Sequence, residues 1–425
     1  SGSITGNITN NAALAYYRTD AHTVSAVLSG TGALTNLAGT LTLTGASTLS
    51  GNTTVSGGIL IQNGTNVSSA VTVASGAFLY GTGSNGTTTV NGQLSAGSAT
   101  NTVGNLKAAA LNLENNGRMA VDITAMTGTA GVNWDVITLG SGGGTYTVNA
   151  ADGSDFVISL KGSPSIDPSQ AYTLKIIDGG TANSFVANKF TILTNDFTAN
   201  TEGGTFSVDA TGGDLNLVFT PNAPAAPTGL AAADGTSTSQ VALSWLDGTR
   251  ETGYVIWRYT ADVAGSATAI YTNAANTTNY NDTTATPGQI YYYWVSATNV
   301  AGSSAKSSSD SGYRKLATVT ITSATDGTDL TQVTLNWTDI TGETGYGIWR
   351  NTSDNSGTAA WLASAAADAT SYNDSTATPG QQYYYFIRAT NSTSESQSDF
   401  QANGEGGYRK LAQVAGVTAT ENLSD

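Results

Sequence analysis

The feature that most limits the fold of this sequence is a long internal repeat in its second half. Residues 253–258 (GYVIWR) recur as 345–350 (GYGIWR), and residues 280–289 (YNDTTATPGQ) recur as 372–381 (YNDSTATPGQ). Both pairs are separated by 92 residues (345 − 253 = 92). A unit of this length is large enough to form its own hydrophobic core, so we expect two similar modules.

Each copy of the repeat contains short runs in which apolar and polar residues alternate. In the first copy these runs are 241–245, 254–258 and 291–297, and turn residues separate them. Alternation with a period of two is typical of strands that bury one face. Several such strands at this spacing indicate a β-sandwich.

The residues of these runs resemble the fibronectin type III family. The first copy carries the resemblance at Val241, Leu243, Trp245, Tyr254, Ile256, Arg258, Pro287, Gly288, Tyr291, Tyr293, Val295, Ala297 and Asn299, and most of these recur in the second copy. The resemblance implies a seven-strand sandwich with Trp245 and Trp337 in the cores, and with Tyr291 and Tyr383 as corner tyrosines. The family consists mainly of spacers and adhesive modules, and the absence of an Arg-Gly-Asp tripeptide means that integrin binding is not implied.

The first half has a different pattern, in which strands of three to five residues alternate with Gly, Asn and Ser turns. Examples are residues 41–45, 53–64, 70–73 and 86–94. One such short strand cannot bury its apolar face alone, whereas stacked coils form a continuous core with main-chain ladders along the axis. We therefore expect a parallel β-helix, that is, a solenoid.

This stretch resembles the autotransporter-associated β-strand repeat of bacterial surface proteins. The matching residues are 39–43, 53–60, 92–97 and 134–137. The resemblance implies a solenoid passenger. Autotransporters end in a membrane β-barrel, whereas this repeat continues into sandwich modules, so self-translocation is not implied.

The overall prediction is an all-β chain, a parallel β-helix followed by two fibronectin type III-like sandwiches. Longer alternating runs between about 140 and 220 are expected to be wider terminal coils that close the solenoid, or a small separate β-domain. The predicted division is 1–140 for the solenoid, 141–221 for the cap or small domain, 222–317 and 318–412 for the two modules, and 413–425 for the start of a truncated third module.

Composition narrows the classes of function. The net charge is −15 and only 11% of the 425 residues are charged, which disfavours nucleic acid and anionic membrane surfaces as partners. There is no cysteine, and no apolar run approaches the ~20 residues of a membrane helix. Because no signal peptide is visible, we interpret the sequence as a fragment of a longer secreted chain.

Catalytic residues are scarce. His22 is the single histidine, and we expect it to be solvated or packed rather than part of a triad. Asp135, Asp152 and Asp155 are the candidates for a carboxylate pair in the solenoid, although Asp152-Gly153 is also a common turn dipeptide. We therefore predict no enzyme activity and no catalytic or cofactor-binding residues.

Calcium is the one cofactor that the acidic composition leaves open, because calcium takes six to eight oxygen ligands. No Asp-x-Asp-x-Asp-Gly loop is present. Asn281-Asp282 and Asn373-Asp374 are candidates for a calcium site, but they are also suited to capping the turns before Pro287 and Pro379. We favour the capping interpretation.

Aromatic side chains form the main candidate for a contact surface. If Tyr291, Tyr293 and Val295 face the core, strand alternation turns the residues between them outward. The predicted contact patch comprises Trp257, Tyr292, Trp294, Trp349, Tyr384 and Phe386. Such a patch would bind a neighbouring subunit or a glycan, and the alternative is ordinary cross-strand stabilisation.

Together these observations lead us to expect an extracellular structural protein of a bacterial cell surface, such as a surface-layer, fibre or stalk component. Its expected partners are copies of itself or other cell-envelope components. The alternative is an adhesin or glycan-binding protein that uses the exposed aromatic residues.

Overall fold

The computed structural model describes residues 6–97, 101–152, 155–392 and 396–416 and divides into two compact units, Ser1–Ala223 and Pro224–Asp425. The described residues are all-β apart from single turns of 3-10 helix at η1 (Ala187–Lys189), η2 (Thr211–Gly213), η3 (Ala264–Ser266) and η4 (Ser356–Thr358). Within the described ranges, no helix has the length and apolar character needed to span a membrane.

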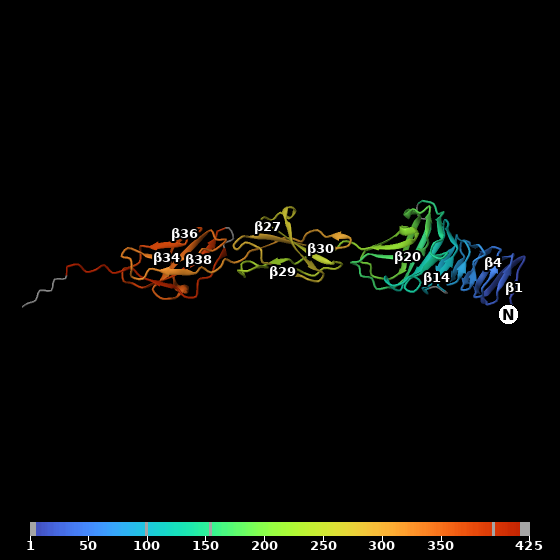
Figure 1. Ribbon diagram of the computed structural model, residues 1–425, viewed down its shortest axis with the longest axis horizontal. Helices are drawn as coiled ribbons and strands as arrows, with labels where there is room; N and C mark the ends of the chain where they lie inside the picture. The colour runs from blue at the N-terminus through green and yellow to red at the C-terminus, as the bar shows by residue number, and fades with distance from the viewer. Residues whose placement is uncertain (1–5, 98–100, 153–154, 393–395, 417–425) are drawn as a thin grey trace, which may run out of the picture. The chain divides into compact units, whose positions relative to one another are not determined.

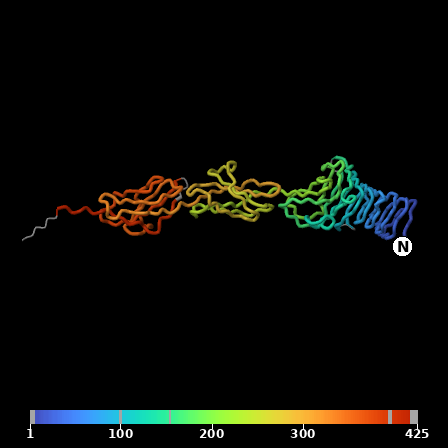
Figure 2. The backbone as a smooth tube through the Cα atoms, in the orientation of Figure 1, coloured from blue at the N-terminus to red at the C-terminus, as the bar shows by residue number. Residues whose placement is uncertain are grey.

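The first unit is a continuous stack of parallel strands, seen in Figures 1 and 2 as successive coils from blue to green. One face contains β6 (Thr53–Val55), β9 (Val71–Val73), β12 (Thr88–Val90), β15 (Ala110–Leu113), β18 (Thr145–Val148) and β21 (Thr181–Asn183). A second face contains β7 (Ile59–Gln62), β10 (Phe78–Gly81), β13 (Gln93–Ala96), β16 (Arg118–Asp122), β19 (Phe156–Gly162) and β22 (Phe190–Phe197). A third face contains β8 (Thr65–Asn66), β11 (Ser84–Asn85), β14 (Asn105–Ala108), β17 (Val136–Leu139) and β20 (Tyr172–Asp178).

The first coils use two long strands, β2 (Ala13–Val24) and β4 (Ala33–Leu43), which pair with each other. β4 continues the stack on both faces, because its first part pairs with β6 and its last part with β7. A short third face is formed by β1 (Ile8–Thr9), β3 (Leu28–Gly30) and β5 (Thr48–Leu49). The solenoid expected from the sequence is therefore present from the first described coils.

Identical inward positions of successive coils stack on one another. On the second face the stack runs through Leu41, Leu60, Leu79, Leu94, Met119, Ile158 and Ile192. Leu60, Leu79 and Leu94 are fully buried. Parallel register places each of these side chains on its equivalent in the next coil, which explains how strands of three to five residues form one continuous core.

Close stacking of the coils also dictates glycine at the corners. Gly58 has a φ of +69°, and a Cβ atom added to it would lie 2.2 Å from the carbonyl oxygen of Gly39 in the coil below. Only glycine combines this left-handed conformation with so close an approach. The Gly-rich turns are thus required by the coil spacing.

The coils widen along the chain. Val71 pairs with Thr88, 17 residues on, whereas Leu111 pairs with Tyr146, 35 residues on. β18, β19, β21 and β22 extend the same sheet as the narrow coils, and the core continues without a break to Phe219. The described part of residues 141–221 thus continues the sheets and the core of the narrow coils. It ends with β23 (Thr205–Asp209) and β24 (Leu215–Thr220), of which β24 pairs antiparallel with β20 and β23 pairs antiparallel with β24.

The second unit contains two modules of antiparallel strands, coloured yellow and orange to red in Figure 1. In the first module, one sheet contains β25 (Ala231–Ala232), β26 (Val241–Ser244) and β29 (Asn279–Asp282). The other contains β28 (Thr268–Ala274), β27 (Gly253–Tyr259), β30 (Tyr291–Asn299), β31 (Gly302–Ser303) and β32 (Asp310–Gly312).

The second module repeats this arrangement. Its smaller sheet contains β33 (Ile321–Ala324), β34 (Val333–Trp337) and β37 (Ser371–Asp374), and its larger sheet contains β36 (Ala360–Ala366), β35 (Gly345–Asn351), β38 (Tyr383–Asn391), β39 (Ser396–Gln397) and β40 (Glu405–Gly407). Residues 413–416 form no strand, and residues 417–425, where a third module is expected to start, lie outside the described residues.

The two tryptophans expected in the module cores are there. Trp245 packs edge-on against Tyr254 with 5.5 Å between ring centroids, and Trp337 packs in the same way against Tyr346 at 5.4 Å. Both tryptophans are buried. This pair links the two sheets of each sandwich. Trp245 directly follows β26 and Trp337 is the last residue of β34, both in the smaller sheet, whereas the tyrosine lies in the larger sheet.

Candidate contact surface

The predicted contact patch lies on the outer face of the larger sheet in each module. Pairing of β27 with β30 sets Trp257 opposite Trp294 and Tyr259 opposite Tyr292. The inward positions of the same strands, including Ile256 and Val295, belong to the module core. The alternation expected from the sequence therefore describes these strands correctly.

The first module nevertheless covers much of this face. Trp294 is only 2% exposed, and Trp257 and Tyr292 are half-buried. The Lys306 ammonium lies 4.1 Å from the centroid of the Trp257 ring, and the indole Nε1 of Trp257 donates to Ser296 Oγ at 2.9 Å. The expectation of an open patch is therefore wrong for Trp294, because a later part of the chain folds back over this face.

The second module covers its equivalent residues with another aromatic side chain. Phe386 is fully buried, and Tyr384 and Trp349 are half-buried. Phe400 packs against Trp349 at 5.1 Å and Phe386 at 5.8 Å, and the Arg388 guanidinium lies 3.9 Å from the Phe400 ring. Phe386 is thus a covered residue, and the expectation of an outward contact is wrong for it as well.

Trp361 is an exposed aromatic residue beside the predicted patch that the sequence analysis missed. It lies on β36 opposite Trp349, packs edge-on against it at 4.8 Å, and is 57% exposed. The corresponding position of the first module is Ala269, so comparing the two copies of the repeat did not indicate an aromatic residue here. A register argument for β36 against β35 would have found it.

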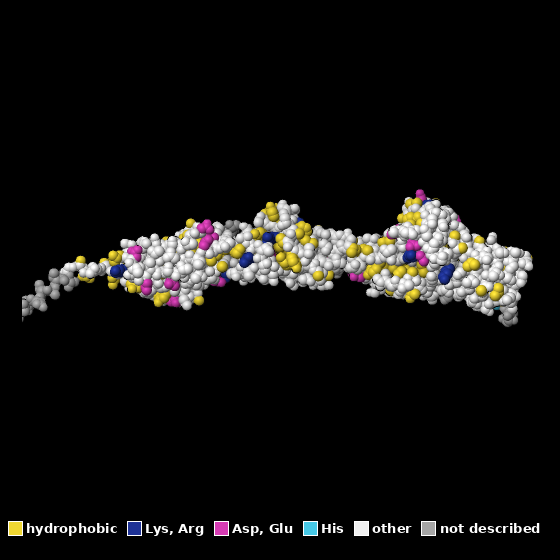
Figure 3. Space-filling model, viewed as in Figure 1, with side chains coloured by type: hydrophobic (Ala, Val, Ile, Leu, Met, Phe, Trp, Pro, Cys, Tyr) yellow, Lys and Arg dark blue, Asp and Glu magenta, His cyan; other side chains and the backbone are white. Residues whose placement is uncertain are grey.

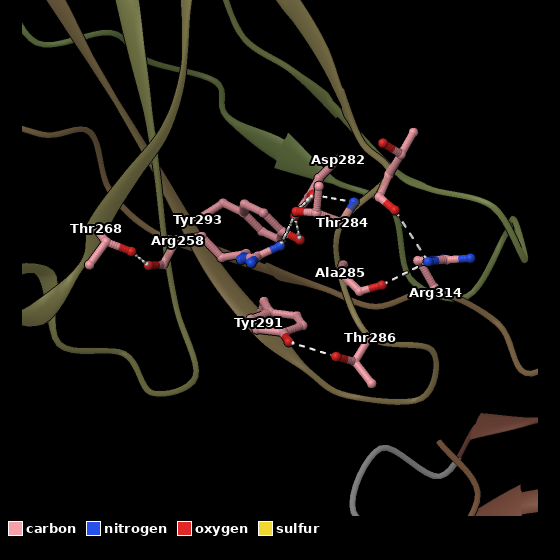
Figure 4. Close-up of polar contacts among 10 residues, drawn as sticks. Arg258, Thr268, Asp282, Thr284, Ala285, Thr286, Tyr291, Tyr293 and Arg314 are labelled. Carbon is pink, nitrogen blue, oxygen red and sulfur yellow. Dashed lines mark hydrogen bonds and ion pairs between the residues drawn. The ribbon is translucent and has the colours of Figure 1, made fainter. Parts of the chain in front are cut away.

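A buried ionic network joins the two sheets of each module (Figure 4). In the first module Asp282 has no exposed side-chain surface, forms an ion pair with Arg258, and accepts a 2.9 Å hydrogen bond from the Tyr293 hydroxyl. Thr284 donates to Asp282 Oδ1 from both its amide, at 2.9 Å, and its hydroxyl, at 2.7 Å. Asp374, Arg350, Tyr385 and Thr376 repeat the arrangement in the second module.

This network decides between the two interpretations of Asp282 and Asp374. Their carboxylate oxygens are occupied by threonine, arginine and tyrosine donors, as a capping and core-pairing role requires. Burial alone would raise the pKa of Asp282, but the hydrogen bonds from Thr284 and Arg258 outweigh it and hold the pKa below its ordinary value. A calcium site at these residues is therefore not supported.

The corner tyrosines bond to side chains. The Tyr291 hydroxyl donates to Thr286 Oγ1 at 3.2 Å, five residues upstream, and Tyr383 donates to Thr378 Oγ1 at the same distance. The Arg258 guanidinium stacks 4.4 Å from the Tyr291 ring. Each corner tyrosine thus fixes the turn that precedes its strand and also covers the arginine of the buried network (Figure 4).

The acidic candidates of the solenoid do not form an open site. Asp135 is 3% exposed, and its carboxylate accepts from the amides of Gly104 at 2.9 Å and Asp122 at 3.1 Å. Burial raises the pKa of Asp135 to about 8. Asp152 is exposed in a turn and Asp155 is half-buried.

Asp122 was not anticipated from the sequence. It is 4% exposed, one of its carboxylate oxygens has no hydrogen-bond partner, and burial raises its pKa above the ordinary range.

His22 stacks on Tyr16 with 6.1 Å between centroids and lines a cavity of about 210 Å³ at the first coils. His22 is therefore packed on an aromatic ring, which is one of the two positions that the sequence analysis expected.

The visible surface is dominated by uncharged polar side chains and backbone. Figure 3 shows few Lys, Arg, Asp or Glu side chains, in small separated groups, as expected for a chain in which 11% of residues are charged. A surface of this kind lacks the extended field that attracts a highly charged ligand.

Comparison with known proteins gives structural similarity only. No family model and no curated protein matches the chain. Among solved structures, a two-domain fibronectin type III segment of chicken tenascin is 14% identical, with 42% of this chain and 97% of that chain covered and a TM-score of 0.34. An Fn3-like protein from Clostridium thermocellum is 36% identical, with 22% and 98% covered and a TM-score of 0.20. The FN1–FN3 domains of chicken CNTN1 are 16% identical, with 49% and 77% covered and a TM-score of 0.22.

The strand pairing of each module is that of a two-sheet antiparallel sandwich, as the sequence predicts. Each module packs a three-stranded sheet on a larger sheet, with a tryptophan and a tyrosine between them. The two modules are fibronectin type III-like domains. In both type III-like domains aromatic side chains lie on the outer face of the larger sheet, and Trp361 of the second domain is 57% exposed beside Trp349.

Proposed function

We propose that this chain is an extracellular structural protein of a bacterial cell surface, which serves as a rigid rod and spacer and associates with copies of itself. The observation that carries the proposal is the uninterrupted parallel ladder of the solenoid, from β2 to β22, over a single continuous core. Such a ladder resists local opening, because each coil is held by the coils on both sides.

The finer assignment of the solenoid is part of the same proposal. Its three-to-five-residue strands and Gly-rich corners are those expected of a passenger built from autotransporter-associated β-strand repeats. In this proposal the type III-like domains act as spacers that add length to the chain. The buried state of Asp122 and Asp135 supports a structural role for the acidic residues of the solenoid, and we propose no enzymatic activity.

Self-association is supported by an edge of the solenoid. Among the described residues, β2 pairs with β4 and with no other strand, so in this stretch of chain the other side of the 12-residue strand is open to a further strand. Its outward side chains include Ala15 and Thr23, which carry no charge to discourage pairing. Arg18 and Asp20 place an ion pair near the middle of this edge, and the main-chain groups of the rest of the strand can pair with a strand of a second copy.

Sedimentation velocity and negative-stain electron microscopy of the purified chain, over a range of concentrations, test the proposal. We expect ordered assemblies that the double substitution Ala15→Lys with Thr23→Lys abolishes. Thr72→Lys, on the exposed side of the central strand β9, is the matched control and should leave assembly unchanged. A monomer at every concentration would reject self-association.

The second candidate function is a glycan-binding adhesin, and the exposed indole of Trp361 favours it. An aromatic ring with one open face is a stacking platform for a sugar ring. Binding on a glycan array that is lost in Trp361→Ser but kept in Trp257→Ser would support this function. An array on which the unaltered chain binds nothing would exclude it.

A further inference from the structure

Three carboxylate groups of the second type III-like domain converge at one end of the sandwich. Asp339 and Glu343 lie in the loop between β34 and β35, and Asp368 lies in the turn between β36 and β37. One oxygen from each lies within 4.8 Å of the other two. Among the residues that the structure describes, none of the three forms an ion pair with Lys or Arg.

Hydrogen bonds fix these carboxylates without using all of their oxygens. The Tyr346 hydroxyl donates to Asp339 Oδ1 at 2.6 Å, and the Asp368 amide donates to Glu343 Oε1 at 2.7 Å. Asp339 and Asp368 are exposed and Glu343 is half-buried. The loop and the turn are therefore held together, while the second oxygens of Asp339 and Glu343 remain available.

The first domain has Asp247, Glu251 and Asn276 at the equivalent positions, each 92 residues earlier. Asn276 and Asp368 occupy the same turn position and share a left-handed backbone, with φ of 58° and 60°. The Tyr254 hydroxyl donates to Asp247 Oδ1 at 2.9 Å, as Tyr346 does to Asp339. The turn conformation and the hydrogen bond from tyrosine to the loop aspartate thus recur in both domains.

Glu251 supplies the independent observation that points to a ligand. It is only 8% exposed, and its Oε2 has no hydrogen-bond partner. A Cβ atom built on Gly248 would lie 3.3 Å from this oxygen and 3.3 Å from the Tyr254 hydroxyl, so Oε2 is directed at the loop that carries Asp247. A buried carboxylate oxygen without a donor is costly, and a cation at this point would remove that cost.

We propose that the loop and turn at this end of each type III-like domain bind a divalent cation of the calcium class. Asp339, Glu343 and Asp368 hold it in the second domain, and Asp247, Glu251 and Asn276 hold it more weakly in the first, where an amide replaces one carboxylate. Oxygen donors alone favour calcium over zinc, which prefers nitrogen and sulfur ligands. Calcium sites of extracellular modules have dissociation constants of about 10⁻⁴–10⁻³ M, and we expect the second domain to fall in that range.

Calorimetric titration of the full 425-residue chain with CaCl2, after treatment with EDTA, tests the proposal. Terbium luminescence is a second readout, since Trp337 lies 5.4 Å from Tyr346, which bonds to the ligand Asp339 and can sensitise the ion. We expect saturable binding, terbium emission that calcium displaces, and a melting temperature that rises with calcium.

Variants assign the binding to these residues. Glu343→Gln and Asp368→Asn should each weaken the tighter site at least about tenfold, which corresponds to ~1.4 kcal/mol. Glu251→Gln should remove the weaker site alone. Asp262→Asn, which removes one exposed carboxylate outside both sites, is the matched control and should change neither. Melting curves in EDTA show whether each variant is folded.

Two results would overturn the proposal. One is the absence of saturable calcium binding up to about 10 mM, tenfold above the weak limit expected for such modules. The other is binding that Glu343→Gln and Asp368→Asn leave unchanged while both variants melt like the unaltered chain in EDTA.

Discussion

The main-chain amide of Asp122 donates a 3.1 Å hydrogen bond to Oδ2 of Asp135, which brings two acidic residues together inside the solenoid. Both side chains are buried, and burial raises the pKa of each carboxyl group. Well below pH 4 both groups are protonated in the folded and unfolded chain, so they contribute nothing to the pH dependence there. Between the ordinary pKa and the raised one, only the unfolded chain has released its proton, and the free energy of unfolding falls as the pH rises.

We therefore predict that the melting temperature of the solenoid falls from pH 5 to pH 9 and that Asp122→Asn reduces this fall. Oδ2 of Asp122 accepts no hydrogen bond, so replacing this oxygen with the amide nitrogen of Asn breaks no existing hydrogen bond. Calorimetric melts of both chains at several pH values provide the measurement. A stabilisation by Asp122→Asn that is the same at pH 4 and pH 9 would show that ionisation of Asp122 plays no part.

The type III-like domains should respond to pH in the opposite direction. Burial alone would raise the pKa of Asp374, but hydrogen bonds from Thr376, Arg350 and Tyr385 hold it below its ordinary value. A lowered pKa contributes stability above about pH 4, and this contribution is lost as the pH falls through the folded-state pKa. We expect the domains to lose stability below about pH 4, and Asp374→Asn to make that loss smaller.

Substitutions in the same network should distinguish the stability contributed by a hydrogen bond from that contributed by an ion pair. Tyr385→Phe removes one buried hydrogen bond to Asp374 and should cost about 1–1.5 kcal/mol. Asp374→Asn leaves the Arg350 charge without its partner and should cost about 3–5 kcal/mol at pH 7. Urea denaturation monitored by tryptophan fluorescence gives both values, and equal costs would contradict the network as described.

The leucine stack of the solenoid leads to a fourth prediction. Leu79 lies between Leu60 and Leu94 and is fully buried, so Leu79→Ala should cost about 2–5 kcal/mol of unfolding free energy. Thr72→Ala, on an exposed position of β9, should change it by less than about 0.5 kcal/mol. Denaturation followed by circular dichroism compares the two, and similar costs would mean that the coils do not share one core.

Two tryptophans of one domain give a matched pair. Trp337 is buried between the sheets, whereas Trp361 is 57% exposed. Trp337→Ala should cost about 3–5 kcal/mol, and Trp361→Ala should cost much less, because only its contact with Trp349 is lost. If Trp361→Ala were as damaging as Trp337→Ala in thermal melts, Trp361 would be a core residue and its proposed contact role would fail.

Local pattern in the sequence was sufficient to predict the all-β fold and the inward side of several strands. The alternation in residues 254–258 and 291–297 placed Ile256, Tyr293 and Val295 in the core, where they lie. Short strands with Gly-rich turns likewise predicted stacked coils, because few other folds bury such strands.

The burial of outward-facing side chains by segments distant in the sequence could not be predicted from such local patterns. Phe386 faces outward as expected but is covered by Phe400, which comes from a segment after β39 with no recognisable pattern. Asp122 is buried beside Asp135, which lies 13 residues further along the chain. The proposed calcium-class site depends on a loop and a turn that lie 25 residues apart at Glu343 and Asp368. These properties arise from tertiary packing, which periodicity does not encode.

Electron microscopy of the native cell surface, with antibodies against this chain, is the most direct test of the central claim. The structural role predicts dense labelling of ordered filaments or arrays outside the cell, and loss of that order when the gene is deleted. Labelling confined to the cell interior, or an envelope whose order is unchanged by the deletion, would contradict it.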